Sequence, residues 1–438
     1  MAKYEIIDGV GIIPQGVTTI EDEAFYRCEN LTSIVIPDSV TTIGSWAFWD
    51  CKNLTSIVIP DSVTEIACDA FSGCENLTSI VIPDSVTEIG SGAFGLCESL
   101  TSIVIPNSVT EIGRRAFYDC ENLTSIVIPD SVTTIESEAF SDCRSLKNIV
   151  IPDSVTEIGE CAFYGCKNLT SIVIPDSVTT IGSGAFSNCS SLTGIVVEEE
   201  NPRYDSRNNC NAIIETATNT LVYGCSTTII PDSVTTIGSE AFSGCKGLTN
   251  IVIPDSITEI GWRAFHGCEN LTSIVIPDSV TKIESDAFQG CKNLTSIVIP
   301  DSVTRIGYGA FTWCENLTSI VIPNSVTTIG RSAFSHCENL TSIVIPDSVT
   351  EIGELVLYGC RSLTGIVVDK GNPRYDSRNN CNAIIETATN TLVCGCSTTI
   401  IPDSVTTIGD YAFWDCKNLT SIVIPDSVTT IESSAFYG

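Results

Sequence analysis

The chain has 438 residues, of which 43% are hydrophobic and 17% are charged, a composition typical of a folded protein. Its 53 acidic and 21 basic residues give a formal net charge of -32, which disfavours binding to nucleic acid or anionic membrane surfaces. No uninterrupted apolar run reaches the ~18 residues that a membrane-spanning helix needs. We therefore expect no nucleic-acid partner and no membrane insertion.

The first segment, MAKYEIIDGVGIIPQGV, has an acidic residue at Glu5 and lacks the basic and then apolar regions of a secretory signal. We therefore expect either a protein that stays inside the cell or a mature or trimmed form of a longer one. The last residues, SSAFYG, stop one residue before the expected position of the next cysteine, which favours trimming.

A 23-residue repeat fills most of the chain, marked by prolines from Pro14 to Pro175, from Pro231 to Pro346, and at Pro402 and Pro425. The two gaps of 56 residues equal two periods plus ten, so each is predicted to hold two modified repeats with a longer loop. The predicted domain is one continuous solenoid. Its segments are a capping hairpin and first turn at 1–30, repeats at 31–197, an irregular double repeat at 198–230, repeats at 231–368, a second irregular double repeat at 369–401, and terminal, truncated repeats at 402–438.

The first half of a repeat predicts a short strand, as in LTSIVIPDSVTTIGSWAFWDCKN at 31–53. Ile34 and Ile36 alternate with Val35, so the two isoleucines face the core and the valine faces outward. Pro37 ends the strand because it has no N–H to donate. The next two residues form a turn.

The second half predicts a short extended piece at Val40 and Ile43, followed by a helical turn. Ala47, Phe48 and Cys51 have the spacing of one face of a helical turn, which would close the core from the far side. Stacking of the repeats at ~4.8 Å then buries these positions in a continuous column.

The pattern LxxIxIPxxVxxIxxxAFxxC resembles the BspA-like leucine-rich repeats of bacterial and protist surface proteins. The irregular segments at 198–231 and 369–402, which share NPRYDSRNNCNAIIETATNTLV, resemble the atypical repeat that punctuates such arrays. The resemblance implies a β-rich, right-handed repeat solenoid with a parallel β-sheet on one face and short helical or 3-10 turns on the other. It also implies adhesion, with host or neighbouring-cell molecules as ligands, at the cell surface or outside the cell. Without a signal peptide in this chain, the cytoplasm is the alternative location.

The 22 cysteines are predicted to be structural. Fifteen recur at the position of Cys51, and we expect them to be small buried hydrophobes without disulfides or metal. So many unpaired thiols suggest a reducing or anaerobic setting. The row of aspartates that begins at Asp38 has two interpretations, turn chemistry after proline and weak cation binding, of which we favour the first.

Catalysis has little support in the sequence. The two histidines, His266 and His336, lie three repeats apart, and neither has a nucleophile or an orienting acid in its own repeat. There is no glycine-rich phosphate loop and no zinc-ligand spacing. We therefore expect no enzymatic activity, no cofactor and no metal.

Four positions vary between repeats while the framework around them does not: those equivalent to Ser45, Trp46, Trp49 and Asp50, which we name slots 45, 46, 49 and 50. On a helical turn whose inner face holds Phe48, all four would point outward and form a ribbon along the solenoid. They hold all five tryptophans, both histidines and seven of the eleven tyrosines of the chain. Aromatic residues and arginine mixed with Ser, Gly and Asp are typical of binding surfaces.

The sequence thus favours a non-enzymatic recognition or adhesion protein that binds a protein or glycan through these slots. The variable slots have three other interpretations: random sequence drift on an exposed surface after duplication, self-association of the chain, and ring stacking between repeats. The outward row of Val35 and its equivalents is uniform, so it offers little basis for discriminating between ligands, although it could pair with another sheet or an extended ligand. The alternative function is a structural spacer or self-assembling fibre. The predicted binding residues are Tyr26, Trp46, Trp49, Arg114, Arg115, Tyr118, Tyr164, Trp262, Arg263, His266, Tyr308, Trp313, His336, Tyr411 and Trp414.

Overall fold

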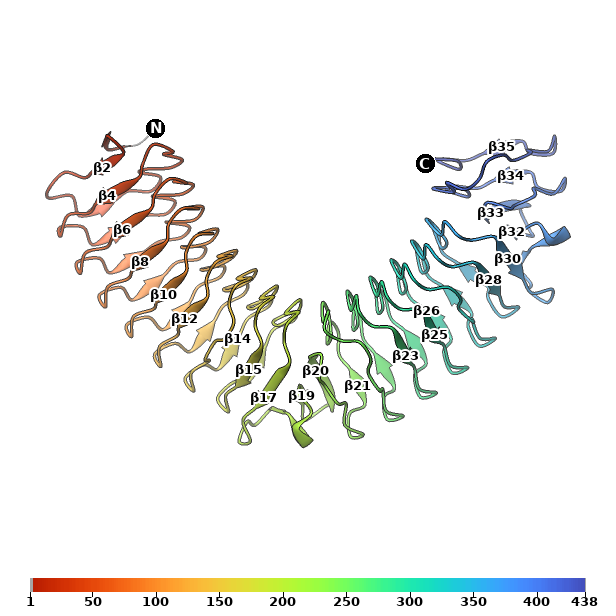
Figure 1. The fold of residues 1–438 in the computed structure, drawn as a ribbon, viewed down its shortest axis with the longest axis horizontal. Helices are drawn as coiled ribbons and strands as arrows, with labels where there is room; N and C mark the ends of the chain where they lie inside the picture. The colour runs from red at the N-terminus through yellow and green to blue at the C-terminus, as the bar shows by residue number, and fades with distance from the viewer. Residues whose placement is uncertain (1–2, 438) are drawn as a thin grey trace. The chain divides into compact units, whose positions relative to one another are not determined.

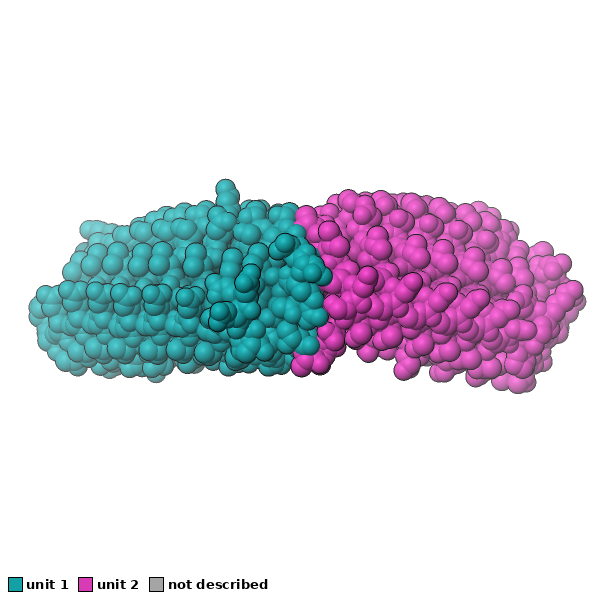
Figure 2. All heavy atoms as spheres, turned by 90° about the horizontal axis from the view of Figure 1, so that it is seen from below, with its two compact units in different colours: residues 1–216 teal, residues 217–438 magenta. Residues whose placement is uncertain are grey.

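The computed structural model describes residues 3–437. They form two compact units, of which unit 1 ends at Thr216 and unit 2 begins at Ala217 (Figure 2). Each unit is a stack of 23-residue repeats, and within unit 1 the strands follow one another in chain order (Figure 1). The predicted class, a β-rich solenoid of leucine-rich-repeat type with parallel strands, is confirmed.

The first strand of each repeat builds what we call the front sheet. In unit 1, β4 (Ser33–Val35) pairs in parallel with β6 (Ser56–Val58), so that each residue lies opposite its equivalent 23 positions later. At the N-terminal end β1 (Glu5–Ile7) and β2 (Val10–Ile12) form an antiparallel hairpin, and β2 pairs with β4. The remaining front strands of unit 1 are β8 (Ser79–Val81), β10 (Ser102–Val104), β12 (Ser125–Val127), β15 (Ser171–Ile174) and β17 (Gly194–Val197).

A second sheet, which we call the side sheet, is built from the two-residue strands after the proline turn. The predicted extended piece at Val40 and Ile43 is confirmed at Ile43 as β5 (Thr42–Ile43), which pairs in parallel with its neighbours on both sides, whereas Val40 lies before the strand. The other side strands of unit 1 are β3 (Thr19–Ile20), β7 (Glu65–Ile66), β9 (Glu88–Ile89), β11 (Glu111–Ile112), β13 (Thr134–Ile135), β14 (Glu157–Ile158) and β16 (Thr180–Ile181). Unit 1 closes with β18 (Tyr204–Asp205), the 3-10 turn η1 (Arg207–Asn209) and β19 (Ala212–Glu215).

Unit 2 repeats the same two sheets. Its front strands are β23 (Ser273–Val275), β25 (Ser296–Val298), β28 (Ser342–Ile345) and β30 (Gly365–Val368). Its side strands are β21 (Thr236–Ile237), β22 (Glu259–Ile260), β24 (Lys282–Ile283), β26 (Arg305–Ile306), β27 (Thr328–Ile329), β29 (Glu351–Ile352), β34 (Thr407–Ile408) and β35 (Thr430–Ile431). The irregular segments supply β20 (Thr220–Gly224), β31 (Tyr375–Asp376), the 3-10 turn η2 (Arg378–Asn380), β32 (Ala383–Glu386) and β33 (Thr391–Gly395).

The core is a column of equivalent side chains stacked from repeat to repeat. Phe48 is fully buried and stacks on Phe25 and Phe71, with ring centroids 5.2 and 5.1 Å apart. The outward direction predicted for Val35 is confirmed, since its side chain is 73% exposed while the flanking isoleucines are buried.

The cysteines at the position of Cys51 are buried under the same column, apart from partly exposed Cys360 and Cys416, and no disulfide bond joins any of the 22 cysteines within residues 3–437. The Cys51 thiol donates to the carbonyl oxygen of Phe25, 3.0 Å away in the preceding repeat. Cys74 makes the same bond to Phe48, at 3.3 Å. Most of these cysteines are therefore small buried side chains, as predicted, and twelve of the fifteen also donate a hydrogen bond that links two repeats.

The segment that follows the side strand, residues 44–51 and their equivalents, forms what we call the turn face. The predicted helical turn is wrong here. The amides of Ala47, Trp49 and Cys51 each bond to the carbonyl three residues earlier, which makes three overlapping β-turns. The alternate amides of Trp46 and Phe48 instead donate to the next repeat, at 3.0 and 2.8 Å. A helix cannot form because φ is +56° at Trp46 and +57° at Asp50.

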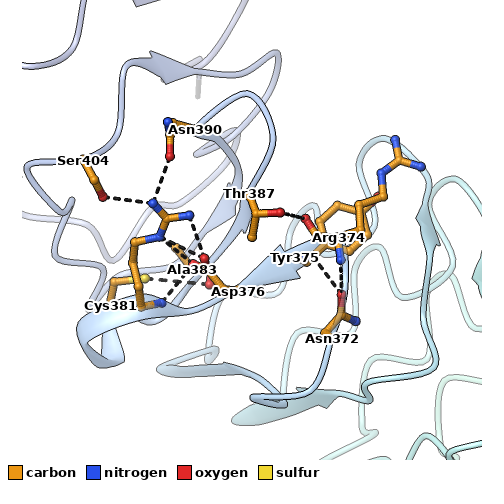
Figure 3. Close-up of polar contacts among 10 residues, drawn as sticks. Asn372, Arg374, Tyr375, Asp376, Cys381, Ala383, Thr387, Asn390 and Ser404 are labelled. Atoms are coloured by element: carbon orange, nitrogen blue, oxygen red, sulfur yellow. Dashed lines mark hydrogen bonds and ion pairs between the residues drawn. The ribbon is translucent and has the colours of Figure 1, made fainter.

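The irregular segment of unit 2 is held by its own polar contacts (Figure 3). The side-chain oxygen of Asn372 accepts from the amides of Arg374 and Tyr375, at 2.9 and 2.8 Å. Arg378 forms an ion pair with Asp376, at 2.6 Å, and also donates to Asn390 and Ser404. These contacts fix the antiparallel strands β31, β32 and β33, which replace a regular repeat at this point.

Candidate binding surface on the turn face

Slots 46 and 50 share a backbone constraint that the sequence analysis missed. In every regular repeat whose residue at these positions is described, φ is positive. Slot 50 accordingly holds mostly glycine, aspartate or asparagine, the residues that adopt this left-handed region most readily. That enrichment was the available signal in the sequence. For other residues the left-handed region costs about 1–2 kcal/mol.

Several large side chains occupy these two slots in spite of that cost. Trp46 has φ of 56° and is 42% exposed, and Trp313 has φ of 62° and is 41% exposed. Neither is buried deeply enough for core packing to explain its presence. The aromatic, arginine and leucine residues that share the left-handed region are Arg27, Leu96, Arg115, Arg263, His336, Leu355 and Tyr411, and three glutamates, Glu23, Glu138 and Glu240, share it too.

The expectation that all four slots point outward is wrong for slot 49. Ser72, Ser141 and Ser187 occupy it and are 5%, 3% and 2% exposed. The side chain at slot 49 lies between successive repeats because the β-turns, unlike a helical turn, direct it along the stack. Tyr26 and Trp49 in this slot contact each other across two repeats, whereas Tyr164 in the same slot is 36% exposed, and Trp262 and Tyr308 in slot 45 are exposed as well.

Near the N-terminal end of unit 1, two predicted rings come together. Tyr26 stacks on Trp49 with centroids 4.8 Å apart and an interplanar angle of 11°. The guanidinium of Arg27 lies over both rings, 5.6 and 4.9 Å from their centroids, and is 3.5 Å from Asp50. Cation–π contacts of this exposed kind contribute about 0.5–1 kcal/mol each.

Two further arginines are fixed over rings of their own repeats. Arg115 lies 5.6 Å from the Tyr118 ring and pairs with Glu138 at 2.7 Å, and Arg114 pairs with the same carboxylate. Arg263 lies 4.4 Å from the Trp262 ring and 3.6 Å from Asp286 in the next repeat. These pairs present an apolar ring beside a positive charge on an otherwise acidic chain.

The C-terminal half of unit 2 carries a connected run of rings on its turn face. Trp313 stacks on His336 with centroids 3.6 Å apart, and His336 meets the edge of Tyr358 at 4.6 Å. Tyr358 lies 5.2 Å from Trp414, which in turn stacks on Tyr411 at 4.7 Å. Tyr358 was not among the predicted binding residues, nor was Tyr437, which meets the edge of Trp414. The run joins predicted residues that lie about 100 positions apart in the sequence.

The two histidines have separate surroundings. His266 lies 3.5 Å from the hydroxyl of Ser243, and burial and then Arg263 lower its pKa. His336 lies among the rings described above, where burial lowers its pKa. Residues 3–437 contain no group of three or more His, Cys, Asp or Glu placed to hold a metal ion.

The buried thiols of the core column are poor nucleophiles and poor metal ligands. Burial raises the pKa of Cys51 to about 12 and that of Cys74 well above its ordinary value. Within the described residues, no helix is both long and apolar enough to cross a membrane.

Parallel sheets, a consensus leucine at the position of Leu31 and a buried Phe and Cys column define a leucine-rich-repeat protein. The chain belongs to the family with BspA type leucine rich repeat regions, whose model matches residues 11–124, 110–220, 219–312, 281–390 and 391–438. Membership suggests a protein-binding or adhesion role, in a family whose members are typically not enzymes.

Solved structures agree with this assignment. A leucine rich cell surface protein from Faecalibacterium prausnitzii A2-165 is 33% identical, with a TM-score of 0.56 over 84% of this chain and 86% of that chain. A leucine-rich repeat protein from Bacteroides ovatus ATCC 8483 is 30% identical, with a TM-score of 0.53 over 83% of this chain and 90% of that one. One from Eubacterium ventriosum ATCC 27560 is 26% identical, with a TM-score of 0.56 over 83% of each chain. No curated protein sequence matches the chain significantly.

Proposed function

We propose that the chain is a recognition protein that binds another protein or a glycan through the rings and arginines of the turn face. The observation that carries the proposal is the set of large, exposed or half-buried side chains in the left-handed region. Other repeats place glycine there, as in Gly92, Gly184 and Gly309 at slot 46. A tryptophan kept at Trp46 against a conformational cost indicates a use for the surface it presents.

The contacts of these side chains support the same proposal. Trp49 is stacked on Tyr26, and Arg115 and Arg263 are each held by a carboxylate. Side chains fixed in this way lose little conformational entropy when a partner binds, which favours affinity. The absence of a described metal cluster and the raised pKa values of the thiols give a catalytic role no comparable support.

We also propose that the chain acts at the cell surface or outside the cell. The support is its similarity to the protein from F. prausnitzii, which is described as a cell surface protein.

The test is a screen of the purified chain against glycan and matrix-protein arrays, followed by a variant set whose residues occur naturally in the same slots. Trp46→Gly copies Gly92, and Trp49→Ser copies Ser72. Because aromatic residues at the centre of an interface contribute about 2 kcal/mol or more, the double variant should lose at least about tenfold in affinity for a partner that contacts this end.

The matched control changes the side sheet instead. Glu65→Thr copies Thr42, its equivalent in the preceding repeat, and should leave binding unchanged. Binding that survives removal of the rings in all repeats, or that the control abolishes, would contradict the proposal.

The second candidate function is self-association or spacing through the front sheet, favoured by its outward row of β-branched residues. Val58 is 76% exposed, and equivalent valines extend along the sheet at ~4.8 Å intervals. An apolar row of this length is unusual on a monomer. If it joins copies of the chain, light scattering will show growth with concentration, and threonine at Val58, Val81 and Val104 will suppress it.

A further inference from the structure

A cavity of about 190 Å³ opens on the turn face of unit 2. It lies between the repeat that contains Tyr358 and the repeat that contains Trp414, beside Cys394 of β33. Its walls combine three rings, Tyr358, Tyr411 and Trp414, with three carboxylates, Glu354, Asp410 and Glu432.

The cavity exists because the irregular segment interrupts the stacking of turn faces. In a regular repeat the amides at the positions of Trp46 and Phe48 donate to carbonyls of the next repeat. The equivalent amides of Leu355 and Leu357 donate to no other residue within 3–437. β33 occupies only part of the space that a regular turn face would fill, so the remainder is open.

The rings are arranged around the indole. The Tyr411 ring stacks on Trp414 at 4.7 Å and 30°, while the Tyr358 ring lies 5.2 Å away and is tilted by 56°. Several aromatic faces and edges thus border one small volume. The negative faces of aromatic rings attract cations, and most strongly where the cation loses its water.

The carboxylates give the cavity a negative charge. The amide of Asp410 donates to Glu432 at 3.1 Å, which holds that carboxylate at the rim. No Lys or Arg lines the cavity, and none among residues 3–437 forms an ion pair with Asp410 or Glu432. Glu354 alone of the three is paired, with Arg331 at 3.6 Å.

The other irregular segment provides an internal comparison. Residues 201–222 and 372–393 are identical, yet the positions that form the cavity differ between the two copies. In the first copy, the residues equivalent to Glu354, Tyr358, Cys394, Asp410, Tyr411 and Trp414 are Ser183, Ser187, Tyr223, Ser239, Glu240 and Ser243.

The exchange at Cys394 has a direct physical consequence. Its equivalent, Tyr223, is a large side chain that is only 3% exposed. Cys394 lines the cavity, so a tyrosine at this position would project into it. One small side chain therefore keeps open a space that the neighbouring repeats line with rings and acids.

We propose that this cavity binds an organic ammonium ion, either a free amine or the side chain of a lysine on a partner. The carboxylates supply the countercharge, the rings supply cation–π contacts, and the free amides of Leu355 and Leu357 can donate to an oxygen of the same ligand. The proposal goes beyond the proposed function and does not rest on it, since a chain that binds no array partner can still bind the cation.

The experiment is a titration of the full chain with tetramethylammonium, followed by calorimetry and tryptophan fluorescence at constant ionic strength. tert-Butanol, which has nearly the same shape and no charge, is the matched probe. We expect saturable binding of tetramethylammonium in the millimolar range and no saturable binding of tert-butanol. Equal responses to the two probes would overturn the proposal.

Two variants place the binding in the cavity, and both use residues that the other copy already carries. Cys394→Tyr should fill the space, and Trp414→Ser should remove the central ring, each weakening binding at least tenfold. Glu65→Thr, a change on the side sheet at a residue that does not line the cavity, should leave it unchanged. Undiminished binding by Cys394→Tyr would contradict the assignment even if the cation binds elsewhere.

A second pair of probes separates the two sources of the ammonium group. Nα-acetyl-lysine amide and its Nε-acetylated form differ by one charge. Selective binding of the first assigns the cavity to a lysine side chain, whereas tetramethylammonium binding without it assigns the cavity to free amines. Binding of the acetylated form as tightly as the charged one would refute recognition of the charge.

Discussion

The left-handed backbone at slot 50 predicts a defined order of stability at Gly290. Its φ is +73°, and a Cβ built there would lie 3.6 Å from the nearest atom, the Cα of Gly267, which is an ordinary contact. An added Cβ therefore meets no steric overlap, and the backbone conformation alone determines how much stability a substitution at Gly290 loses. Alanine in the left-handed region loses about 1–2 kcal/mol, partly offset by the 0.4–1 kcal/mol that it gains by restricting the unfolded chain. We expect Gly290→Ala to lose about 1 kcal/mol.

Asparagine is the matched control, because Asn188 occupies the same slot with φ of +62°. Gly290→Asn should lose less than about 0.5 kcal/mol, since asparagine tolerates this region through local hydrogen bonds. Hydrogen exchange read by mass spectrometry on peptides from 284–314 measures the local opening free energy in the full chain. A loss of 1 kcal/mol accelerates exchange about fivefold. The reasoning would be refuted if the Gly290→Ala variant exchanged as slowly as the unchanged chain, or if the Gly290→Asn variant exchanged as fast as the Gly290→Ala variant.

Three further predictions concern the core, the thiols and the acidic side sheet. Phe117 is fully buried between two stacked rings, so Phe117→Ala should lower the free energy of unfolding by about 3–5 kcal/mol. Phe117→Leu should lower it much less, because Leu357 occupies the same position in another repeat. Urea unfolding measures both changes. At pH 8 a disulfide reagent should modify exposed Cys68 rapidly and buried Cys74 only after unfolding, because burial raises the pKa of Cys74; rapid reaction of Cys74 would show that the column opens readily. Burial and then two neighbouring glutamates raise the pKa of Glu111, so the folded chain takes up a proton more readily than the unfolded one. The contribution of Glu111 to stability should therefore rise as pH falls from 7 through that raised pKa, and Glu111→Gln should remove this contribution from the slope of the urea midpoint against pH.

Much of the fold follows from residues that recur with one period. Ile34 and Ile36 alternate as strand residues, and Pro37 ends the strand at a fixed place. The burial of Phe48 and Cys51 follows from their repetition, since identical side chains stack only if each faces the same interior. These features depend on local spacing, and local spacing is visible in the sequence.

The backbone conformation of the turn face was harder to predict from the sequence. The spacing of Ala47, Phe48 and Cys51 fits both a helical turn and three β-turns, and hydrogen bonds to the next repeat decide between them. Because the amides of Trp46 and Phe48 bond outside their own repeat, the apolar spacing within 23 residues does not reveal the choice, and the local signal is the enrichment of Gly, Asp and Asn at slot 50. The prediction that slot 49 points outward failed for the same reason.

The sequence by itself determined the repeat, its core and the positions at which large side chains are free to differ, because each is a property of one 23-residue unit. Only the tertiary structure decided which of those side chains meet. Tyr358 and Trp414 lie 56 positions apart, and their rings come within 5.2 Å because an irregular segment replaces the repeat between them. The cavity beside Cys394 arises from that replacement, through contacts between separate repeats that no single unit encodes.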